Sequence, residues 1–242
     1  YKTAVSFSIN HSDCITAVSK SLKNDTIELF DIEKEIDVIH NFIDVEKFIS
    51  KETPCERNLL AKKDEKIVVH ISNFRPLKRI MDVVYVFEQI RSKINAKLIM
   101  IGEGPEKPKA QRYCEKNNLS DKVIFLGNSS EVDDILCFSD LFLLLSEKES
   151  FGLSALEAMI HKVPVISTNV GGLPELNKNN YSGFLFDIGE INKMAKKSIE
   201  ILSNKKLLKT YKNQAFENAK RFDIKKIIKK YESVYKKAKE IK

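Results

Sequence analysis

Short apolar runs alternate with amphipathic segments along most of the chain. Runs that are apolar throughout are typical of strands buried on both faces of a parallel sheet, whereas apolar residues at every third or fourth position are typical of helices. Their alternation predicts an α/β fold with a doubly wound parallel sheet covered on both faces. We expect strands at 66–72, 96–102, 122–127, 140–146, 163–168 and 182–187, and helices at about 79–93, 106–118, 130–138, 152–161 and 189–203.

The first part of the chain repeats the alternation on a smaller scale. Its elements make only half of a doubly wound domain, so we expect the other half to lie upstream. They are helices at 2–11 and 20–30 and strands at 14–19 and 36–40.

The remaining segments complete the predicted organisation. Segment 41–58 has the character of a linker, and two helices, at 205–220 and 223–241, follow the last strand. We predict a remnant of an N-terminal domain at 1–44, a main domain at 45–222, and a helix at 223–242 that packs back towards the N-terminal part.

The composition is that of a globular protein, with 43% apolar residues in 242. The longest apolar run, LFLLL at 141–145, is far too short to cross a membrane, and the first residues lack the features of a signal peptide. We therefore expect a cytoplasmic protein without integral membrane contact. The cysteines form no CxxC pair, which indicates reduced, structural thiols; they are Cys14, Cys55, Cys114 and Cys137.

The formal net charge is +7, and lysine outnumbers arginine. Lysine is the weaker residue for bidentate recognition of phosphates or bases, and the lysines near the C-terminus fit a solvated helix face. We therefore expect no nucleic acid partner, with a basic surface that touches nucleic acid or anionic lipid as the alternative. No histidine spacing typical of zinc ligands is present, so we expect no metal.

Four loops follow predicted strands at the edge where open parallel sheets bind ligands. The first, SNFRPLKR, offers Arg75, Lys78 and Arg79 at the start of a helix. The second, GEGP, contains Gly102 and Gly104, which allow close approach to the backbone. Neither GxxxxGK[ST] nor GxGxxG occurs, which argues against a nucleoside triphosphatase or a dinucleotide enzyme.

The third loop opens a helix in SEKESFGLSALEAMI. We expect Ser150 to be its N-cap. The residues that follow would then present free backbone N–H groups, with the positive end of the helix dipole behind them, to an anion. These residues are Gly152, Leu153 and Ser154.

Two carboxylates flank this helix start, and the fourth loop lies further along the chain. Glu149 precedes the helix, and Glu157 can face the same cleft and accept hydrogen bonds from vicinal hydroxyls. The fourth loop, NVGGLPEL, has paired glycines suited to a tight turn before a short helix. Each loop taken alone is more often an ordinary turn, cap or charged surface; only their combined order and spacing points to a binding site.

In this order the loops resemble the donor-binding domain of glycosyltransferase family 4, retaining enzymes with the GT-B fold. The resemblance is carried by VVHISNFRPLKR, GEGP, FLG, SDLFLLLSEKESFGLSALEAM, VPVIST and GGLPE, and Glu149 and Glu157 match the family's E-x7-E motif. HISNFRPLKR, LLLSEKESFGL, FSINHSDCITAVS and NFID are similar to a narrower group of the family. That group moves N-acetylglucosamine from UDP-N-acetylglucosamine (UDP-GlcNAc) to L-malate, which starts bacillithiol biosynthesis.

The resemblance implies a role for each site residue. Glu157 would bind the ribose hydroxyls of a UDP-sugar, and Glu149 the hydroxyls of the sugar. Lys78 and Arg75 would neutralise the diphosphate, and the N–H groups at the helix start would assist them. Gly127 and Asn128 would lie near the uracil, with the GEGP glycines also on the donor side. In the mechanism usually proposed for the fold, the acceptor hydroxyl attacks on the face that UDP leaves, and a donor phosphate oxygen receives its proton.

The sequence departs from the family pattern at three places. Asn73 stands where the family usually has an arginine, so Arg75 must substitute from a slightly different position. Ser150 stands where many relatives have glycine. His161 and Lys162 stand where a small residue and glycine are common, and loss of a C-cap glycine costs about 1 kcal/mol of stability.

The resemblance covers nearly the whole chain but only the later part of such an enzyme. The glycine-rich N-terminal loop and most of the acceptor-binding domain are not in this sequence, so 1–44 would be a remnant of the acceptor side. We expect a UDP-GlcNAc donor, a small hydroxy-acid acceptor and no cofactor, with a homo-oligomer left open. The alternatives are a family 4 enzyme with another acceptor, such as a lipid-linked sugar or inositol phosphate, and a non-catalytic nucleotide-sugar-binding or scaffold module.

Overall fold

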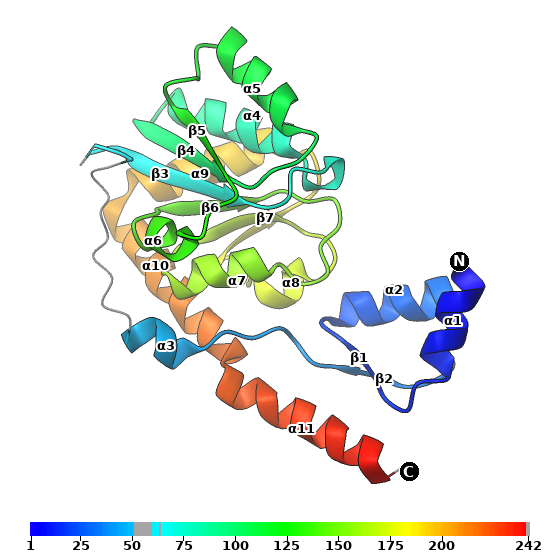
Figure 1. The fold of residues 1–242 in the computed structure, drawn as a ribbon. Coiled ribbons are helices and arrows are strands. Elements are labelled where there is room, and N and C mark those ends of the chain that lie inside the picture. The colour runs from blue at the N-terminus through cyan, green and yellow to red at the C-terminus, as the bar shows by residue number, and fades with distance from the viewer. Residues whose placement is uncertain (51–59, 63, 241–242) are drawn as a thin grey trace.

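The computed structural model describes residues 1–50, 60–62 and 64–240 (Figure 1). The described residues form a six-stranded sheet and a separate two-stranded sheet near the N-terminus. Within each sheet, every pair of neighbouring strands is parallel. The predicted doubly wound parallel sheet is confirmed. In the order β5-β4-β3-β6-β7-β8, its strands are Val123–Gly127, Ala96–Ile101, Lys66–Ile71, Leu141–Leu144, Val165–Thr168 and Gly183–Phe186.

Alternate side chains of each strand enter two different apolar layers, as the period of an extended chain requires. In β3, Val68 faces one layer, and Ile67 and Val69 face the other. The first layer is covered by α4 (Ile80–Arg91), α5 (Lys107–Lys116) and α9 (Ile191–Ser203), and the second by α6 (Val132–Cys137), α7 (Leu153–Ile160) and α8 (Leu173–Leu176). Helix α10 (Lys205–Ala219) contributes apolar residues to both layers.

The strand order reverses direction between β3 and β6. Strands β4 and β5 are added in turn on one side of β3. Strand β6 then pairs with the other side of β3, and β7 and β8 follow it outward. In such sheets the loops that follow the two central strands diverge and leave a crevice for ligands. Here those loops are 72–79 and 145–152, two of the four that the sequence singled out.

The N-terminal segment forms a smaller unit beside this sheet (Figure 1). Strands β1 (Ile15–Ala17) and β2 (Ile36–Val38) pair with each other and pack with α1 (Lys2–Asn10) and α2 (Lys20–Phe30). These strands are shorter than the predicted 14–19 and 36–40, because only three residue pairs are in register.

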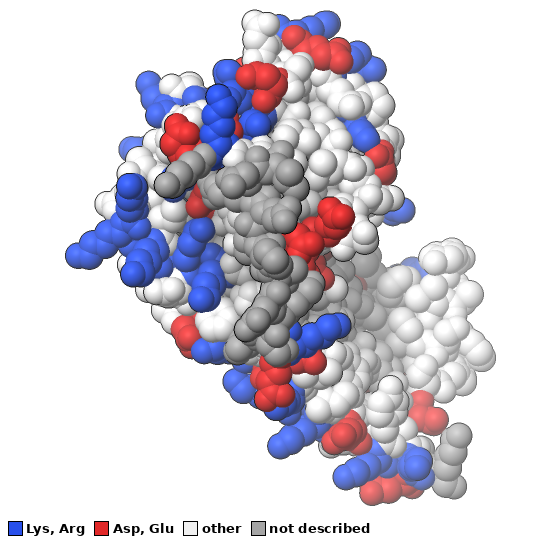
Figure 2. Space-filling model, turned by 60° about the vertical axis from the view of Figure 1, so that its left-hand side comes forward, with Lys and Arg blue, Asp and Glu red and all other residues white. Residues whose placement is uncertain are grey.

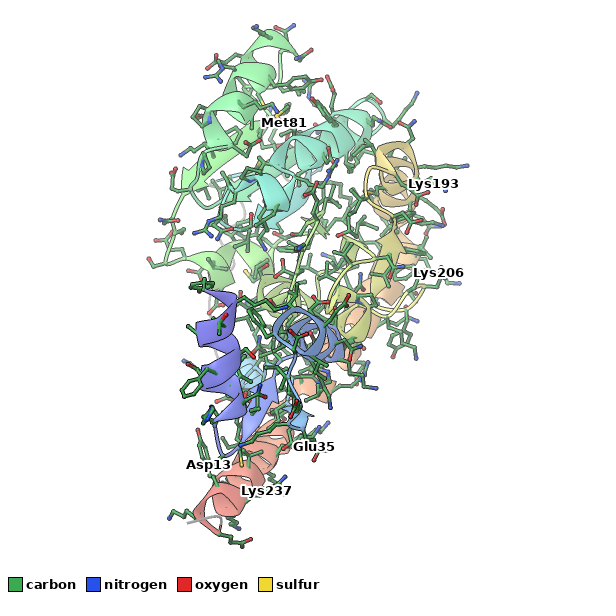
Figure 3. The ribbon with its side chains drawn as sticks, turned by 90° about the vertical axis from the view of Figure 1, so that its right-hand side faces the viewer. Asp13, Glu35, Met81, Lys193, Lys206 and Lys237 are labelled. Atoms are coloured by element: carbon green, nitrogen blue, oxygen red, sulfur yellow. The ribbon has the colours of Figure 1, made fainter. Side chains whose placement is uncertain are left out.

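Helix α11 (Ile224–Glu240) lies along this N-terminal unit, as Figure 1 and the side view in Figure 3 both show. The backbone N–H of Ile224 donates to the Ile43 carbonyl at 2.8 Å, and the rings of Phe42 and Tyr231 lie 6.3 Å apart. In Figure 3, Asp13 and Lys237 lie near the same end of the molecule, while Lys193 and Lys206 project outward from α9 and α10. The domain boundaries at 44 and 222 stay a prediction.

Two expectations need correction. The expected linker contains a helix, α3 (Val45–Ser50), whose Val45 is buried in the second apolar layer; residues 51–58 lie outside the described residues. Cys14 and Cys114 are free, as predicted, but Cys137 is disulfide-bonded, so the expectation of a reduced thiol is wrong there. Cys55 lies outside the described residues.

Basic and acidic side chains share the surface. On the face in Figure 2, Lys and Arg gather towards one side, and Asp and Glu lie among them. Among the described residues, no helix is both long enough and apolar enough to span a bilayer.

Candidate functional site

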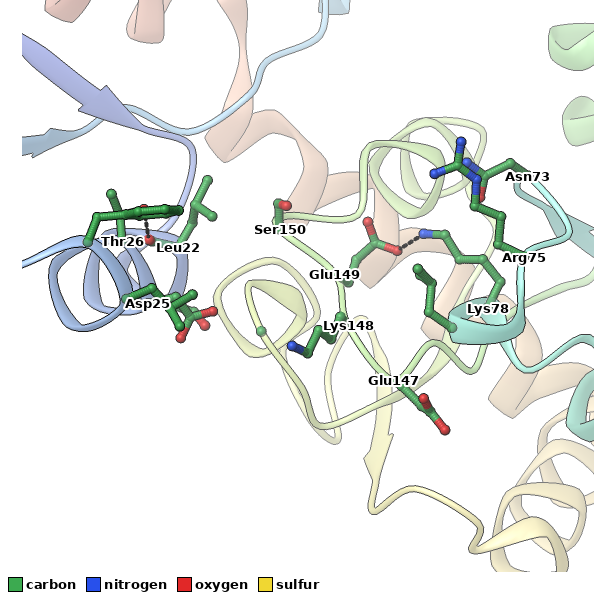
Figure 4. A pocket seen from close by; sticks show the side chains of 15 residues that line it. Leu22, Asp25, Thr26, Asn73, Arg75, Lys78, Glu147, Lys148, Glu149 and Ser150 are labelled. Carbon is green, nitrogen blue, oxygen red and sulfur yellow. Dashed lines mark hydrogen bonds and ion pairs between the residues drawn. The ribbon is translucent and has the colours of Figure 1, made fainter. Parts of the chain in front are cut away.

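A cavity of about 590 Å³ opens at the crevice between the loops that follow β3 and β6. Helix α2 of the N-terminal unit faces these loops across the opening (Figure 4). The cavity is lined by Ser21, Leu22, Asp25, Thr26, Leu29, Phe30, Asn73, Arg75, Leu77, Lys78, Glu147, Lys148, Glu149, Ser150 and Gly171.

Lys78 and Glu149 form an ion pair in this cavity. The Lys78 Nζ donates to Glu149 Oε2 at 2.5 Å, and the Ser146 hydroxyl donates to the same oxygen at 3.3 Å. The Lys78 and Glu149 side chains are only 14% and 16% exposed, so solvent screens their attraction less than it screens a surface pair. The pair holds a cation and an anion, both within reach of a ligand, on two different loops.

Two further contacts tie these loops together. The backbone N–H of Glu147 donates to the Leu77 carbonyl at 2.7 Å, and Arg79 Nη1 donates to Glu147 Oε1 at 2.6 Å. Arg79 also donates to Asp82 at 2.5 Å, and these partners raise the pKa of its guanidinium further. Arg79 is thus engaged in joining the loops, whereas Arg75 and Lys148 form no ion pair within the described part of the chain and remain available to a ligand.

A buried histidine, His70, holds the start of the first loop through hydrogen bonds. His70 of β3 is fully buried, and burial lowers its pKa to about 4. The neutral ring can therefore donate from Nδ1 to the Leu143 carbonyl of β6 at 2.8 Å and accept at Nε2 from the Ser72 hydroxyl at 2.7 Å. His70 links the two central strands to the start of the loop that carries Lys78.

The predicted glycines of the second loop serve close backbone packing. A Cβ on Gly102 would lie 1.8 Å from the Ser72 carbonyl oxygen, so only glycine fits where this turn meets the loop after β3. The Gly102 N–H donates to the Gly127 carbonyl at 2.8 Å, which joins the turns after β4 and β5. Gly104 packs in the same way against the Phe74 backbone.

The paired glycines of the fourth loop let it lie against the Glu149 loop. A Cβ on Gly171 would lie 2.0 Å from the Glu149 carbonyl oxygen, and the Gly172 N–H donates to that oxygen at 2.8 Å. Three of the four loops therefore meet around the Lys78–Glu149 pair.

The N-cap of helix α7 lies two residues later than expected. Its N-cap is Gly152 in a left-handed conformation (φ 96°), and the prediction that Ser150 caps it is wrong. Phe151, which lies between Ser150 and Gly152, is buried, whereas Ser150 is exposed and lines the cavity. Ser150 is therefore not placed to cap the first turn of α7. Among the described residues, the backbone N–H groups of Leu153 and Ser154 have no hydrogen-bond partner, as an anion site at a helix start requires.

The second acid, Glu157, does not line this cavity. It lies inside α7, half-buried, and burial together with the nearby Asp133 raises its pKa. Its carboxylate forms no hydrogen bond or ion pair within the part of the chain that the structure describes. Glu157 is therefore a half-buried acceptor near Asp133 of α6, outside the lining of this cavity.

The structure thus brings together only part of the predicted site. Glu149, Lys78 and Arg75 line one cavity, and Asn73 lines it beside them. The predicted residues that do not line it are Glu157, Gly152, Leu153, Ser154, Gly127, Asn128, Gly102 and Gly104.

Sequence reasoning missed the other wall of the cavity. Asp25 and Thr26 of α2 line that wall, and Lys148, also missed, lines the cavity from the Glu149 loop. The position of Lys148 within SEKES was a local signal, but nothing in the sequence of α2 links that helix to a loop over a hundred residues later. Among the described residues, no group of three or more His, Cys, Asp or Glu side chains is placed to hold a metal ion.

The solved structures that match this architecture include glycosyltransferases of the GT-B fold. TarM from S. aureus, in complex with Fondaparinux, alpha-GlcNAc-glycerol and UDP, matches with a TM-score of 0.82 at 27% identity, over 96% of this chain and 45% of that chain. HepE from Anabaena, in complex with UDP and glucose, has a TM-score of 0.85 over 98% of this chain and 67% of that one; at 21% identity this shows the fold alone.

The family follows from the sequence as well. The family model "Glycosyl transferases group 1" matches residues 53–218, and the chain belongs to this family. It is 40% identical to the N-acetyl-alpha-D-glucosaminyl L-malate synthase of Bacillus anthracis over 96% of this chain and 61% of that protein. It is 30% identical to the poly(ribitol-phosphate) alpha-N-acetylglucosaminyltransferase of Staphylococcus aureus, over 86% of this chain and 41% of that protein. The chain therefore spans less than two thirds of the length of these relatives.

Proposed function

We propose that the protein takes part in the transfer of N-acetylglucosamine from UDP-GlcNAc to L-malate, with retention of the anomeric configuration. The observation that carries this proposal is the Lys78–Glu149 pair. It lies in the cavity between β3 and β6, where the strand order of the sheet reverses. The similarity to the malate synthase of Bacillus anthracis favours this donor and this acceptor over others.

Each group would act at a different part of the donor. Lys78 and Arg75 would neutralise the diphosphate, and the unpaired N–H groups of Leu153 and Ser154 would donate to it. These groups supply positive charge where the leaving group develops negative charge, and so we propose that no metal cofactor is needed. Glu149 would accept hydrogen bonds from the sugar hydroxyls.

The uridine would lie further along the same edge of the sheet. Glu157 would bind the ribose hydroxyls, which fits its half-buried carboxylate without a partner of its own. Gly127 and Asn128, where β5 ends, would contact the uracil, and the turn containing Gly102 and Gly104 holds that end in place. The acceptor would enter from the side of the cavity lined by α2.

Mass spectrometry of the products tests the proposal. We expect the protein to convert UDP-GlcNAc and L-malate into a glucosaminyl malate and UDP, equally well with and without EDTA. In Glu149→Gln the turnover should fall at least about tenfold, because the neutral amide loses charge-assisted hydrogen bonds from the sugar hydroxyls. Product from another acceptor but not from malate would contradict the proposed acceptor. UDP binding without any transfer would favour the alternative, a nucleotide-sugar-binding module without catalysis.

A further inference from the structure

A carboxylate from the main sheet unit binds the start of α2. Glu175 of α8 accepts the backbone N–H of Lys20 at 3.0 Å and that of Ser21 at 3.1 Å, and its Oε2 lies 3.0 Å from Nε2 of His40. We call these contacts the Glu175 clasp. They join residues that are separated by 135 to 155 positions in the sequence.

The clasp satisfies donors that a helix start leaves without partners. The Ser19 side chain accepts the N–H of Leu22 at 3.0 Å, and Glu175 accepts the two N–H groups before it. A negative charge at this end also interacts favourably with the helix dipole. Burial raises the pKa of Glu175, but the hydrogen bonds from Lys20, His40 and Ser21 outweigh burial and hold that pKa below its ordinary value.

The clasp connects the two walls of the cavity. Glu175 follows Gly171 and Gly172, which lie against the Glu149 backbone, so its position is tied to the loop with the ion pair. On the other side, α2 lines the cavity with residues that include Asp25 and Thr26. The ring of His40 lies 5.7 Å from that of Phe151 in the Glu149 loop, which adds a second connection.

Apolar packing gives α2 little other anchorage. None of its residues is fully buried, and Leu29 is 59% exposed. The small apolar cluster that α2 joins belongs to the N-terminal unit and contains Ala17, Ile32 and Ile36. The position of α2 relative to the main sheet therefore depends strongly on polar contacts such as the clasp.

We propose that Glu175 is a positioning residue that fixes α2 as the second wall of the cavity, opposite the Glu149 loop. Its effect on sugar transfer rests on the function proposed above, because α2 would then hold the acceptor side in place. The positioning of α2 does not rest on that function, and it can be measured without any substrate.

Hydrogen–deuterium exchange of the whole chain tests this role. In Glu175→Ala we expect amide exchange in residues 20–30 to rise at least about tenfold, while exchange in β3 and β6 stays unchanged. Glu175→Gln keeps one acceptor oxygen and has nearly the same shape, so it should fall between Ala and the wild type, and it provides the readout if the alanine variant does not fold. The matched control is Glu200→Ala, which removes an exposed glutamate paired with Lys197 on α9.

Titration with UDP completes the test. Glu175 does not line the cavity, so all three variants should bind UDP within twofold of the wild type. Unchanged exchange in α2, or exchange that rises equally in β6 and α7, would overturn the positioning role. Failure of the wild type to bind UDP would instead count against the proposed function, and the exchange result for α2 would still stand.

Discussion

The charge state and the partners of single side chains at this site depend on their surroundings more than on their residue type. Lys78 and Glu149 come from different loops and are brought within 2.5 Å of each other in a partly buried place. Glu157, of the same residue type as Glu149, is half-buried beside Asp133, and its pKa is raised. The spacing of the two glutamates was visible in the sequence, but their separation into different environments depends on the start of α7.

His70 should make the stability of the protein depend on pH. Burial lowers its pKa to about 4 from an ordinary value of 6.5, so the unfolded chain binds a proton over this interval and the folded protein does not. The stabilising contribution is therefore complete above pH 6.5 and is lost as the pH falls towards 4. Between pH 7 and pH 5 this one residue should lower the free energy of unfolding by about 2 kcal/mol.

Urea denaturation of His70→Gln at the two pH values checks this prediction. Glutamine can donate to Leu143 and accept from Ser72 as the neutral ring does, but it does not titrate. The variant should lose about 2 kcal/mol less than the wild type between pH 7 and pH 5. Equal losses in the two proteins would show that His70 does not carry this pH dependence.

At the scale of elements, most helices and strands follow from the sequence, and the exceptions have identifiable causes. The strands of the main sheet are mostly apolar, so their positions were predicted within a few residues. Helix α3 was missed because it is short and buries Val45 in a layer formed by distant residues. The cap of α7 was misplaced because Ser150 is a good cap by type, whereas burial of Phe151 decides the local backbone.

The residue that follows the C-cap of helix α7 has a strained backbone. Lys162, just beyond its C-cap His161, has a φ of 60°, a left-handed conformation that favours glycine. Its ammonium lies 5.3 Å from the centre of the Phe216 ring, which offsets part of the strain. We expect Lys162→Gly to be about 1 kcal/mol more stable than Lys162→Ala, because both lose the ring contact and only alanine keeps the backbone strain.

Thermal and urea unfolding of these two variants measure the difference directly. Because Lys162 does not line the cavity, UDP binding should be the same in both variants. An alanine variant as stable as the glycine variant would contradict the strain at Lys162.

At the scale of the whole molecule, the sheet order decides where the site lies. The switch point between β3 and β6 could be expected from alternating strands and helices, and with it the loops that carry Lys78 and Glu149. The wall formed by α2 could not be predicted, because it depends on how the N-terminal unit meets the main sheet. The Glu175 clasp belongs to the same class of contact, in which residues distant in the sequence meet only in the folded chain.

We propose that the cavity beside Lys78 binds the diphosphate of a sugar nucleotide. Isothermal titration with UDP tests it on the wild type, on Lys78→Met, and on Lys197→Met as a control from α9, outside the cavity. Loss of a charge-assisted hydrogen bond to phosphate costs about 1.5–3 kcal/mol, so the affinity of Lys78→Met should fall at least about tenfold. Lys197→Met should stay within twofold of the wild type. Equal affinity for UDP in the wild type and in a folded Lys78→Met would contradict the account.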